Sequence, residues 1–196
     1  MVTGDAFPLE GATLNGRQLL PHSASTHTTM EYSFCPKCGG TLELVVVKPF
    51  EPPRMVCIRC QFVFFQDPKV AACCIVHIDQ KIILLRRAIH PGYGKWVFPG
   101  GYVDRGETVT AAAIREAREE VNLEVQLVSL LGVYSYPQSP VIIIVYVAEM
   151  KGGTLLASDE TLEVSAFAPR EIPWEELAFP STTEALKDFV RLYYPE

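Results

Sequence analysis

Two Cys-x-x-Cys pairs constrain this chain more than any other feature. Cys35 and Cys38 form the first pair, Cys57 and Cys60 form the second, and 18 residues lie between the pairs. Each pair can present two thiolates from one tight turn, and two facing turns complete the four-sulfur shell that Zn²⁺ prefers. A full thiolate shell leaves no position open for water, so we expect a structural rather than a catalytic zinc ion.

The alternative for these cysteines is a pair of disulfides in a secreted protein. No apolar stretch typical of a secretory signal precedes them, and Cys73 and Cys74 would be two further thiols without a role. We therefore favour zinc, and we expect Cys73 and Cys74 to be small buried side chains on opposite faces of a strand.

The length of 196 residues suits one ordinary domain with a small added module. We expect a flexible extension over residues 1–30, a zinc ribbon over 31–66 that needs its metal to fold, and a larger domain over 67–196. The extension lacks the Arg-rich composition of a transit peptide. We expect a cytoplasmic protein, or one of an organelle stroma or matrix if the extension is a targeting segment.

The apolar pattern of the larger domain mixes strands with helices. The residues Asp79 and Gln80 are expected to form a hairpin turn, 91–101 a loop, and Ser181 the N-cap of a closing helix. A mixed sheet covered by helices, and hence an α/β fold, is the expected architecture. The expected strands are 42–47, 62–65, 70–78, 81–87, 123–134, 141–149 and 162–167, and the expected helices are 108–121 and 181–194.

Three carboxylates cluster on the first of these helices. Glu116, Glu119 and Glu120 fall within an arc of about 100° of the helix surface, and neither Arg115 nor Arg118 lies on that arc. We therefore expect a cation to neutralise them, and carboxylate oxygens favour Mg²⁺ or Mn²⁺. A solvated acidic helix face is the alternative.

The sequence around the cluster decides between these alternatives. The pattern Gly101-x5-Glu107-x7-Arg115-Glu116-Ala117-x-Glu119-Glu120-x-Asn122-Leu123 resembles the Nudix box. The segment 96–101, Trp-Val-Phe-Pro-Gly-Gly, resembles the approach to that box. The resemblance implies a Nudix α/β/α sandwich with a mixed β-sheet, and hydrolysis of a nucleoside diphosphate linked to another group.

The resemblance also implies roles for individual residues. Glu116, Glu119 and Glu120 would bind Mg²⁺ or Mn²⁺, while Glu107 and Arg115 would pair and brace the loop against the helix. Gly100 and Gly101 would let the backbone approach metal and phosphate. Asn122 replaces the usual glycine and tolerates the left-handed conformation that ends a helix.

The general base that the resemblance implies is a glutamate of the box or of a later loop. Glu119 is the choice within the box, and Glu160 and Glu163 are candidates in the acidic loop 158–163. A solvated acidic turn is the alternative for each of the two loop residues.

Two ribbon-bearing branches of the family are similar to this chain. The NADH pyrophosphatases, which also remove NAD caps from RNA, carry a signature rich in Ser-Gln-Pro-Trp-Pro that ends near Pro-Gln-Ser. Residues 137–139 match this Pro-Gln-Ser ending, but the stretch before them lacks the tryptophan and the Gln-Pro that precedes it. The ADP-ribose and FAD pyrophosphatases have a C-terminal stretch that looks like residues 171–180. We favour this second branch and expect ADP-ribose or FAD as substrate, with release of AMP.

Further side chains are candidates for substrate contact. Tyr134 and Tyr136 could stack on adenine, although core packing is the commoner role of such residues. Of Arg86 and Arg87 at the end of a strand, one could contact phosphate, and we select Arg87.

The charge balance argues against macromolecular partners. The net charge is −6, and residues 31–69 hold five basic against four acidic side chains, which is no basic patch. A non-catalytic sensor that binds nucleic acid is thus the least favoured function. No apolar run approaches the roughly 20 residues that span a bilayer. We expect a small nucleotide derivative as partner, no nucleic acid and no membrane; a homodimer stays open.

Overall fold

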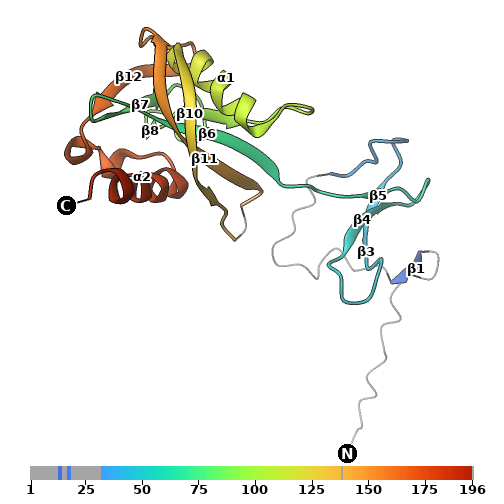
Figure 1. Cartoon of the computed structure of the whole chain (residues 1–196). Helices are drawn as coiled ribbons and strands as arrows, with labels where there is room; N and C mark the ends of the chain where they lie inside the picture. Colours follow the sequence, from blue (N-terminus) through green and yellow to red (C-terminus); the bar gives the residue numbers. More distant parts are fainter. Residues whose placement is uncertain (1–12, 15–16, 19–31, 138, 196) are drawn as a thin grey trace, which may run out of the picture. The chain divides into compact units, whose positions relative to one another are not determined.

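The computed structural model describes residues 13–14, 17–18, 32–137 and 139–195. These residues divide into two compact units, with the division between Asp67 and Pro68 (Figure 1). The expected flexible extension lies outside the described residues, apart from β1 (Thr13–Leu14) and β2 (Arg17–Gln18), which pair in antiparallel fashion. No helix in the described ranges is long and apolar enough to cross a membrane.

The first unit contains a three-stranded antiparallel sheet in the order β3-β4-β5. Its strands are β3 (Leu42–Val45), β4 (Arg54–Cys57) and β5 (Val63–Phe64). Strand β4 was not among the expected strands; Pro52 and Pro53 directly precede it, and its last residue is Cys57. The two other strands are shorter than expected.

The second unit is built on a mixed sheet in the order β10-β11-β6-β7-β12. Only β11 and β6 pair in parallel, and the remaining pairs are antiparallel. The loop expected over 91–101 contains two short strands, β8 paired with β7 and β9 paired with β6. The strands are β6 (Lys69–Ile78), β7 (Lys81–Arg87), β8 (Trp96–Val97), β9 (Gly100–Tyr102), β10 (Leu123–Tyr134), β11 (Val141–Gly153) and β12 (Thr161–Phe167).

The hairpin between β6 and β7 is confirmed. Asp79 and Gln80 have φ values of 47° and 63°, the left-handed conformation that a two-residue hairpin turn requires. Ile78 pairs with Lys81 directly beside the turn. This register fixes which face of the sheet each side chain of β7 points to. The last two residues of the strand, Arg86 and Arg87, therefore point to opposite faces.

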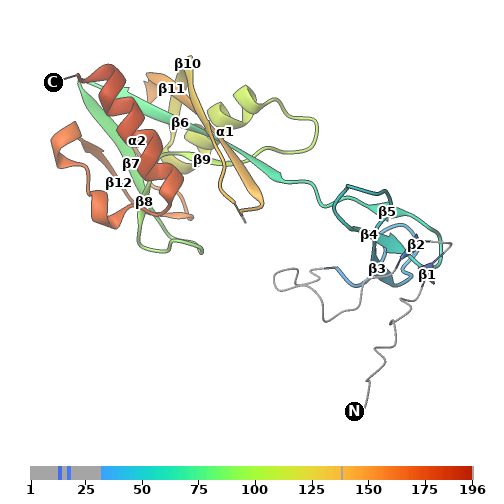
Figure 2. The same cartoon turned by 90° about the horizontal axis from the view of Figure 1, so that it is seen from below.

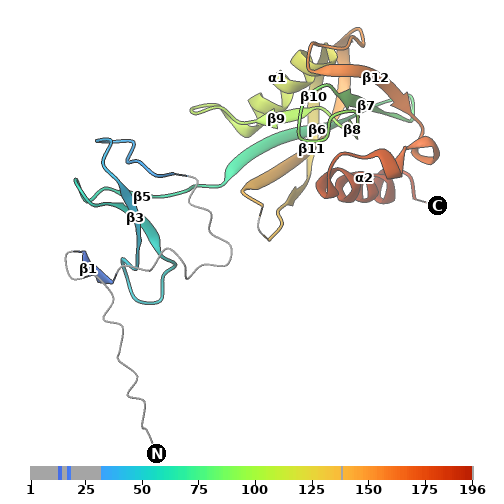
Figure 3. The same cartoon turned by 180° about the vertical axis from the view of Figure 1, so that it is seen from behind.

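Two helices cover opposite faces of this sheet (Figure 1), and the view from behind shows the same three layers (Figure 3). Helix α1 (Val109–Val121) packs on one apolar cluster, and α2 (Pro180–Tyr193) packs on the other and lies across the strands in Figure 2. Short 3₁₀ turns, η1 (Pro169–Glu171) and η2 (Trp174–Glu176), precede α2. The expected α/β fold with a mixed sheet is confirmed.

The ends of the helices follow from local chemistry. The Thr108 hydroxyl accepts a hydrogen bond from the Ala111 amide at 3.2 Å, and Asn122 ends α1 at φ 55° and ψ 37°. The expectation that Ser181 caps α2 is wrong: the helix starts at Pro180, and Phe179 is its N-cap. Proline suits the first helical position, so Ser181 falls inside the first turn and is buried.

Candidate active site

The four cysteines of the first unit converge on one point. Their sulfur atoms all lie within 4.8 Å of one another, with 3.7 Å between Cys35 and Cys60 and 3.5 Å between Cys38 and Cys57. A tetrahedral site with Zn–S bonds of 2.3 Å has S–S edges of about 3.8 Å. The cluster therefore fits a four-thiolate zinc site.

Gly100 and Gly101 form the floor of the candidate active site in the second unit. Strand β9 places Gly100 opposite Cys73 of β6. A Cβ atom on Gly100 would lie 2.6 Å from the Cys73 Cα, and one on Gly101 would lie 2.6 Å from the Glu116 carboxylate carbon. Glycine at position 100 thus allows β9 to approach Cys73 closely, and a side chain at position 101 would displace the Glu116 carboxylate.

Glu120 is the most buried carboxylate of the site. Its side chain accepts a 2.8 Å hydrogen bond from the Gly100 amide, and its backbone carbonyl accepts one from the Thr161 hydroxyl at 3.2 Å. Burial raises the pKa of Glu120 to about 7 against the opposing Gly100 bond, and the charges of Glu116 and Glu160 raise it further. Burial also raises the pKa of Glu116. A nearby positive charge would therefore stabilise the ionised forms of both Glu116 and Glu120.

Arg115 links the loop before α1 to the glutamates on the helix. It donates from Nε and Nη2 to the two oxygens of Glu107 at 2.9 and 3.0 Å, so the expected pairing is present. Its Nη1 also donates to Glu116 at 2.7 Å and to Glu119 at 3.0 Å. The expectation that no arginine neutralises the cluster is wrong, because a long side chain reaches well beyond the arc of its own Cα.

The donor set fits a hard divalent cation. Within the described ranges, Oε1 of Glu120 and Oε2 of Glu116 accept no protein hydrogen bond. The side chain of Glu119 is 60% exposed. The glutamate oxygens do not gather as tightly as the four sulfur atoms, which alone among the described residues form a group of potential ligands within 4.8 Å. Arg115 lies between Glu116 and Glu119, so a bound cation would compete with its guanidinium.

Glu160 and Glu163 lie in different surroundings. The Ala88 amide donates to the Glu160 carbonyl at 2.8 Å, and the charge of the Glu160 side chain is close enough to raise the pKa of Glu116 and Glu120. Glu163 instead lies 3.9 Å from Arg86, after a register shift between Thr161 and Glu163. Of the two, Glu160 is therefore the glutamate whose charge acts on Glu116 and Glu120, whereas Glu163 faces Arg86.

Arg86 and Arg87 separate in the same way. The alternation along β7 turns Arg87 toward the α1 side, where its charge lowers the pKa of Glu120, whereas Arg86 lies over the Trp96 ring at 6.0 Å. The Arg87 guanidinium donates to the Pro91 carbonyl at 2.9 Å and lies 5.3 Å from the centre of the Phe179 ring. Of Arg86 and Arg87, it is therefore Arg87 whose charge acts on the buried carboxylate Glu120.

The two candidate tyrosines lie on the α2 side of the sheet. Tyr134 is buried and donates to Asp188 at 3.0 Å, and Tyr136 donates to Glu184 at 2.8 Å. Neither ring lies on the side of the sheet that holds the box glutamates. Tyr134 is instead part of the apolar core, which was the alternative to stacking on adenine. Sequence reasoning missed Thr161, for which no pattern in the sequence gave a signal.

Comparisons with known proteins agree with this geometry. Residues 67–193 match the model of the NUDIX domain family, and residues 33–66 match the family described as Nudix N-terminal, a zinc ribbon. An ADP-ribose pyrophosphatase of Methanocaldococcus jannaschii is 39% identical over 131 residues, which are 65% of this chain and 76% of the relative. An NAD-capped RNA hydrolase, NudC, of Vibrio atlanticus is 29% identical over 66% of this chain, which spans about half (46%) of that relative's length.

Among solved structures, a NUDIX hydrolase of Nitrosomonas europaea is similar to both parts of the chain. It has a TM-score of 0.78 and 34% sequence identity, and the match covers 83% of this chain and 94% of the other. The fold and the box residues agree with the two family matches. The chain therefore belongs to the Nudix family and is a Nudix hydrolase with an N-terminal zinc ribbon.

Proposed function

We propose that this Nudix hydrolase cleaves the pyrophosphate bond of an ADP-linked substrate, ADP-ribose or FAD, and releases AMP. The observation that carries the proposal is the pair formed by the buried Glu120 and the half-buried Glu116, both of whose carboxylates lie against the Gly100–Gly101 backbone. The 39% identity with an ADP-ribose pyrophosphatase supports ADP-ribose as the first substrate to test.

Glu116, Glu119 and Glu120 would hold Mg²⁺ or Mn²⁺. When bound, such an ion neutralises phosphate charge and lowers the pKa of a coordinated water. The Gly100 amide fixes one oxygen of Glu120 and leaves the other free to bind. Glu107 holds two of the guanidinium nitrogens of Arg115, which keeps the loop before α1 fixed to the helix.

Arg87 and Glu160 would act on the substrate from the β7 and β12 side of the site. The Arg87 charge lies near Glu120, where it can attract a phosphate oxygen. Glu160 can accept a proton from the attacking water, and Glu119 is the second candidate for that role. Glu163 pairs with Arg86 and is the weakest candidate for the general base.

The zinc cluster would have a structural role. Four thiolates complete the coordination shell, so the ion holds the two cysteine turns together and offers no position for substrate or water. Hydrolysis would then belong to the second unit alone.

An NADH or NAD-cap pyrophosphatase is the alternative function. It is favoured by similarity to an enzyme named as acting on NAD-capped RNA and by the Pro-Gln-Ser sequence at residues 137–139. This alternative includes an RNA-linked substrate, although the net charge of −6 led us to expect no nucleic acid as partner. The sensor function, which lacks catalysis, has no support from membership in a hydrolase family.

The test is a side-by-side measurement of product release from ADP-ribose, FAD, NADH and a nucleoside triphosphate. Each would be incubated with Mg²⁺, Mn²⁺ or EDTA, and the products separated by chromatography. AMP released from ADP-ribose or FAD at the highest kcat/KM, and only with metal, supports the proposal. Preference for NADH would favour the alternative, and no cleavage of any substrate would contradict both.

A further inference from the structure

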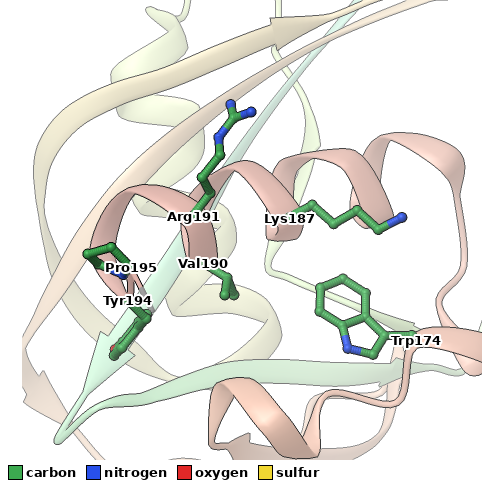
Figure 4. A pocket seen from close by; sticks show the side chains of 6 residues that line it. All are labelled: Trp174, Lys187, Val190, Arg191, Tyr194 and Pro195. Atoms are coloured by element: carbon green, nitrogen blue, oxygen red, sulfur yellow. The ribbon is translucent and has the colours of Figure 1, made fainter.

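A pocket on the α2 side of the sheet has no part in the proposed reaction. It has a volume of about 370 Å³ and lies between η2 and the last turns of α2. The box glutamates are on α1, which packs on the opposite face of the sheet. Figure 4 shows the six side chains that line the pocket: Trp174, Lys187, Val190, Arg191, Tyr194 and Pro195.

The aromatic walls of this pocket are held in place. Trp174 and Tyr194 both pack against the apolar cluster beneath α2, and the Tyr194 ring contacts Phe189 edge to face at 5.9 Å. The segment after Trp174 is tied to β8, since the Ala178 amide donates to the Trp96 carbonyl at 2.8 Å. Val190 lies between the two rings (Figure 4). A flat ring could therefore bind here without first ordering the walls.

Two basic side chains, Lys187 and Arg191, line the pocket in a chain whose net charge is −6. Figure 4 shows the Lys187 side chain running along the pocket above the Trp174 ring, while Arg191 points away from that ring. Arg191 pairs with Asp188 at 2.8 Å. No carboxylate of the described part of the chain lies within 4.0 Å of the Lys187 ammonium group, so this charge is available to an anion.

We propose that this pocket binds a planar aromatic ring that carries an anionic group, with the size of a nucleoside monophosphate. The ring would lie between Trp174 and Tyr194, and the phosphate would face Lys187. The volume lies near the lower end of the range for small-molecule pockets, which suits one base with its ribose phosphate but not a dinucleotide. The site is separate from the candidate active site and does not depend on the proposed function.

The test uses the full-length protein with its zinc site filled and AMP as the probe, without added Mg²⁺ or Mn²⁺. Calorimetry measures the affinity, and fluorescence reports contact with Trp174. The chain's other tryptophan, Trp96, is only 6% exposed. We expect quenching of the Trp174 emission and saturable binding, with adenosine and ribose 5-phosphate each binding at least about tenfold more weakly because each lacks one half of the ligand.

Matched variants locate the binding site. Lys187→Ala should weaken AMP binding about tenfold, whereas Lys151→Ala, an exposed lysine at the end of β11, should leave the affinity unchanged. Glu120→Gln should also bind AMP as the unmodified protein does. Because Lys187 is an exposed side chain, its loss leaves the fold intact even if Trp174→Ala does not. Absence of AMP binding, equal affinities for the two lysine variants, or loss of binding in Glu120→Gln would overturn the proposal.

Discussion

The amide of Gly100 donates a 2.8 Å hydrogen bond to the carboxylate of Glu120, twenty residues further along the chain. This bond joins the short strand β9 to the last turn of α1. It also fixes one oxygen of a buried acid, so the second oxygen has a defined direction. The loop and the helix are thereby parts of one site, and changes in either should affect metal binding.

Glu120→Gln should lower kcat about 100-fold or more, because a neutral amide is a far weaker ligand for a divalent cation than a carboxylate. The variant should still fold, since glutamine can accept the Gly100 hydrogen bond. Steady-state kinetics and thermal melting measure the two effects. Glu124→Gln, on the exposed side of β10, is the control, and full activity in Glu120→Gln would contradict the metal assignment.

Gly101→Ala should weaken Mg²⁺ or Mn²⁺ binding. The added Cβ would lie 2.6 Å from the Glu116 carboxylate carbon, so the side chain of Glu116 must move. We expect a loss of at least about tenfold in metal affinity, measured by calorimetry, with a smaller change in melting temperature. An unchanged affinity would mean that the Glu116 carboxylate does not bind the ion from this position.

Glu160→Gln and Glu163→Gln form a matched pair that tests the general base. The charge of Glu160 acts on the box glutamates, whereas Glu163 faces Arg86. We expect Glu160→Gln to lower kcat about 100-fold with little change in KM, and Glu163→Gln to change kcat less than about threefold. Equal effects on kcat would show that the register shift in β12 does not separate their roles.

Without Mg²⁺ or Mn²⁺ bound, the protein should have a lower free energy of unfolding as the pH rises. Burial raises the pKa of Glu120 to about 7, so the folded state binds a proton that the unfolded state has already released. The stabilisation present below about pH 4.5 is lost as the pH rises toward 7, and it amounts to at most about 3 kcal/mol. Urea unfolding at pH 5 and pH 8, without added Mg²⁺ or Mn²⁺ and with the zinc site filled, measures it, and the pH dependence should shrink in Glu120→Gln.

Cys35→Ser should release zinc and unfold the first unit. Structural zinc contributes about 10–16 kcal/mol of binding free energy in zinc-finger peptides, so we expect the first unit to lose its fold when the ion is lost. Metal analysis should find one zinc ion per chain in the unmodified protein and less in the variant. The control is Cys74→Ser, a buried thiol of β6 that lies outside the cluster; an unchanged zinc content in Cys35→Ser would contradict the site.

The sequence predicted the features that depend on neighbouring residues. The hairpin at Asp79 and Gln80, the strand 123–134 and the helix capped by Asn122 all follow from local periodicity and turn chemistry. The convergence of the four cysteines follows from their spacing, and the box pattern placed Glu116 and Glu120 on one helix.

The remaining features depend on contacts between distant residues. The reach of Arg115 to Glu119 depends on rotamers that no spacing specifies. The division of Glu160 from Glu163 arises from a single register shift in β12. Tertiary packing, rather than local preference, decided both of these features.

The parallel pairing of β11 with β6 affects the order of events during synthesis. Lys69 of β6 pairs with Val141, roughly 70 residues later, and the segment between them contains α1 and all of the box. The central strand β6 can pair with β7 and β9 earlier, but it gains its parallel partner β11 only after the segment that contains the box has left the ribosome. Until then, one edge of β6 has unpaired backbone groups, and a nascent chain halted before residue 141 would be prone to aggregation.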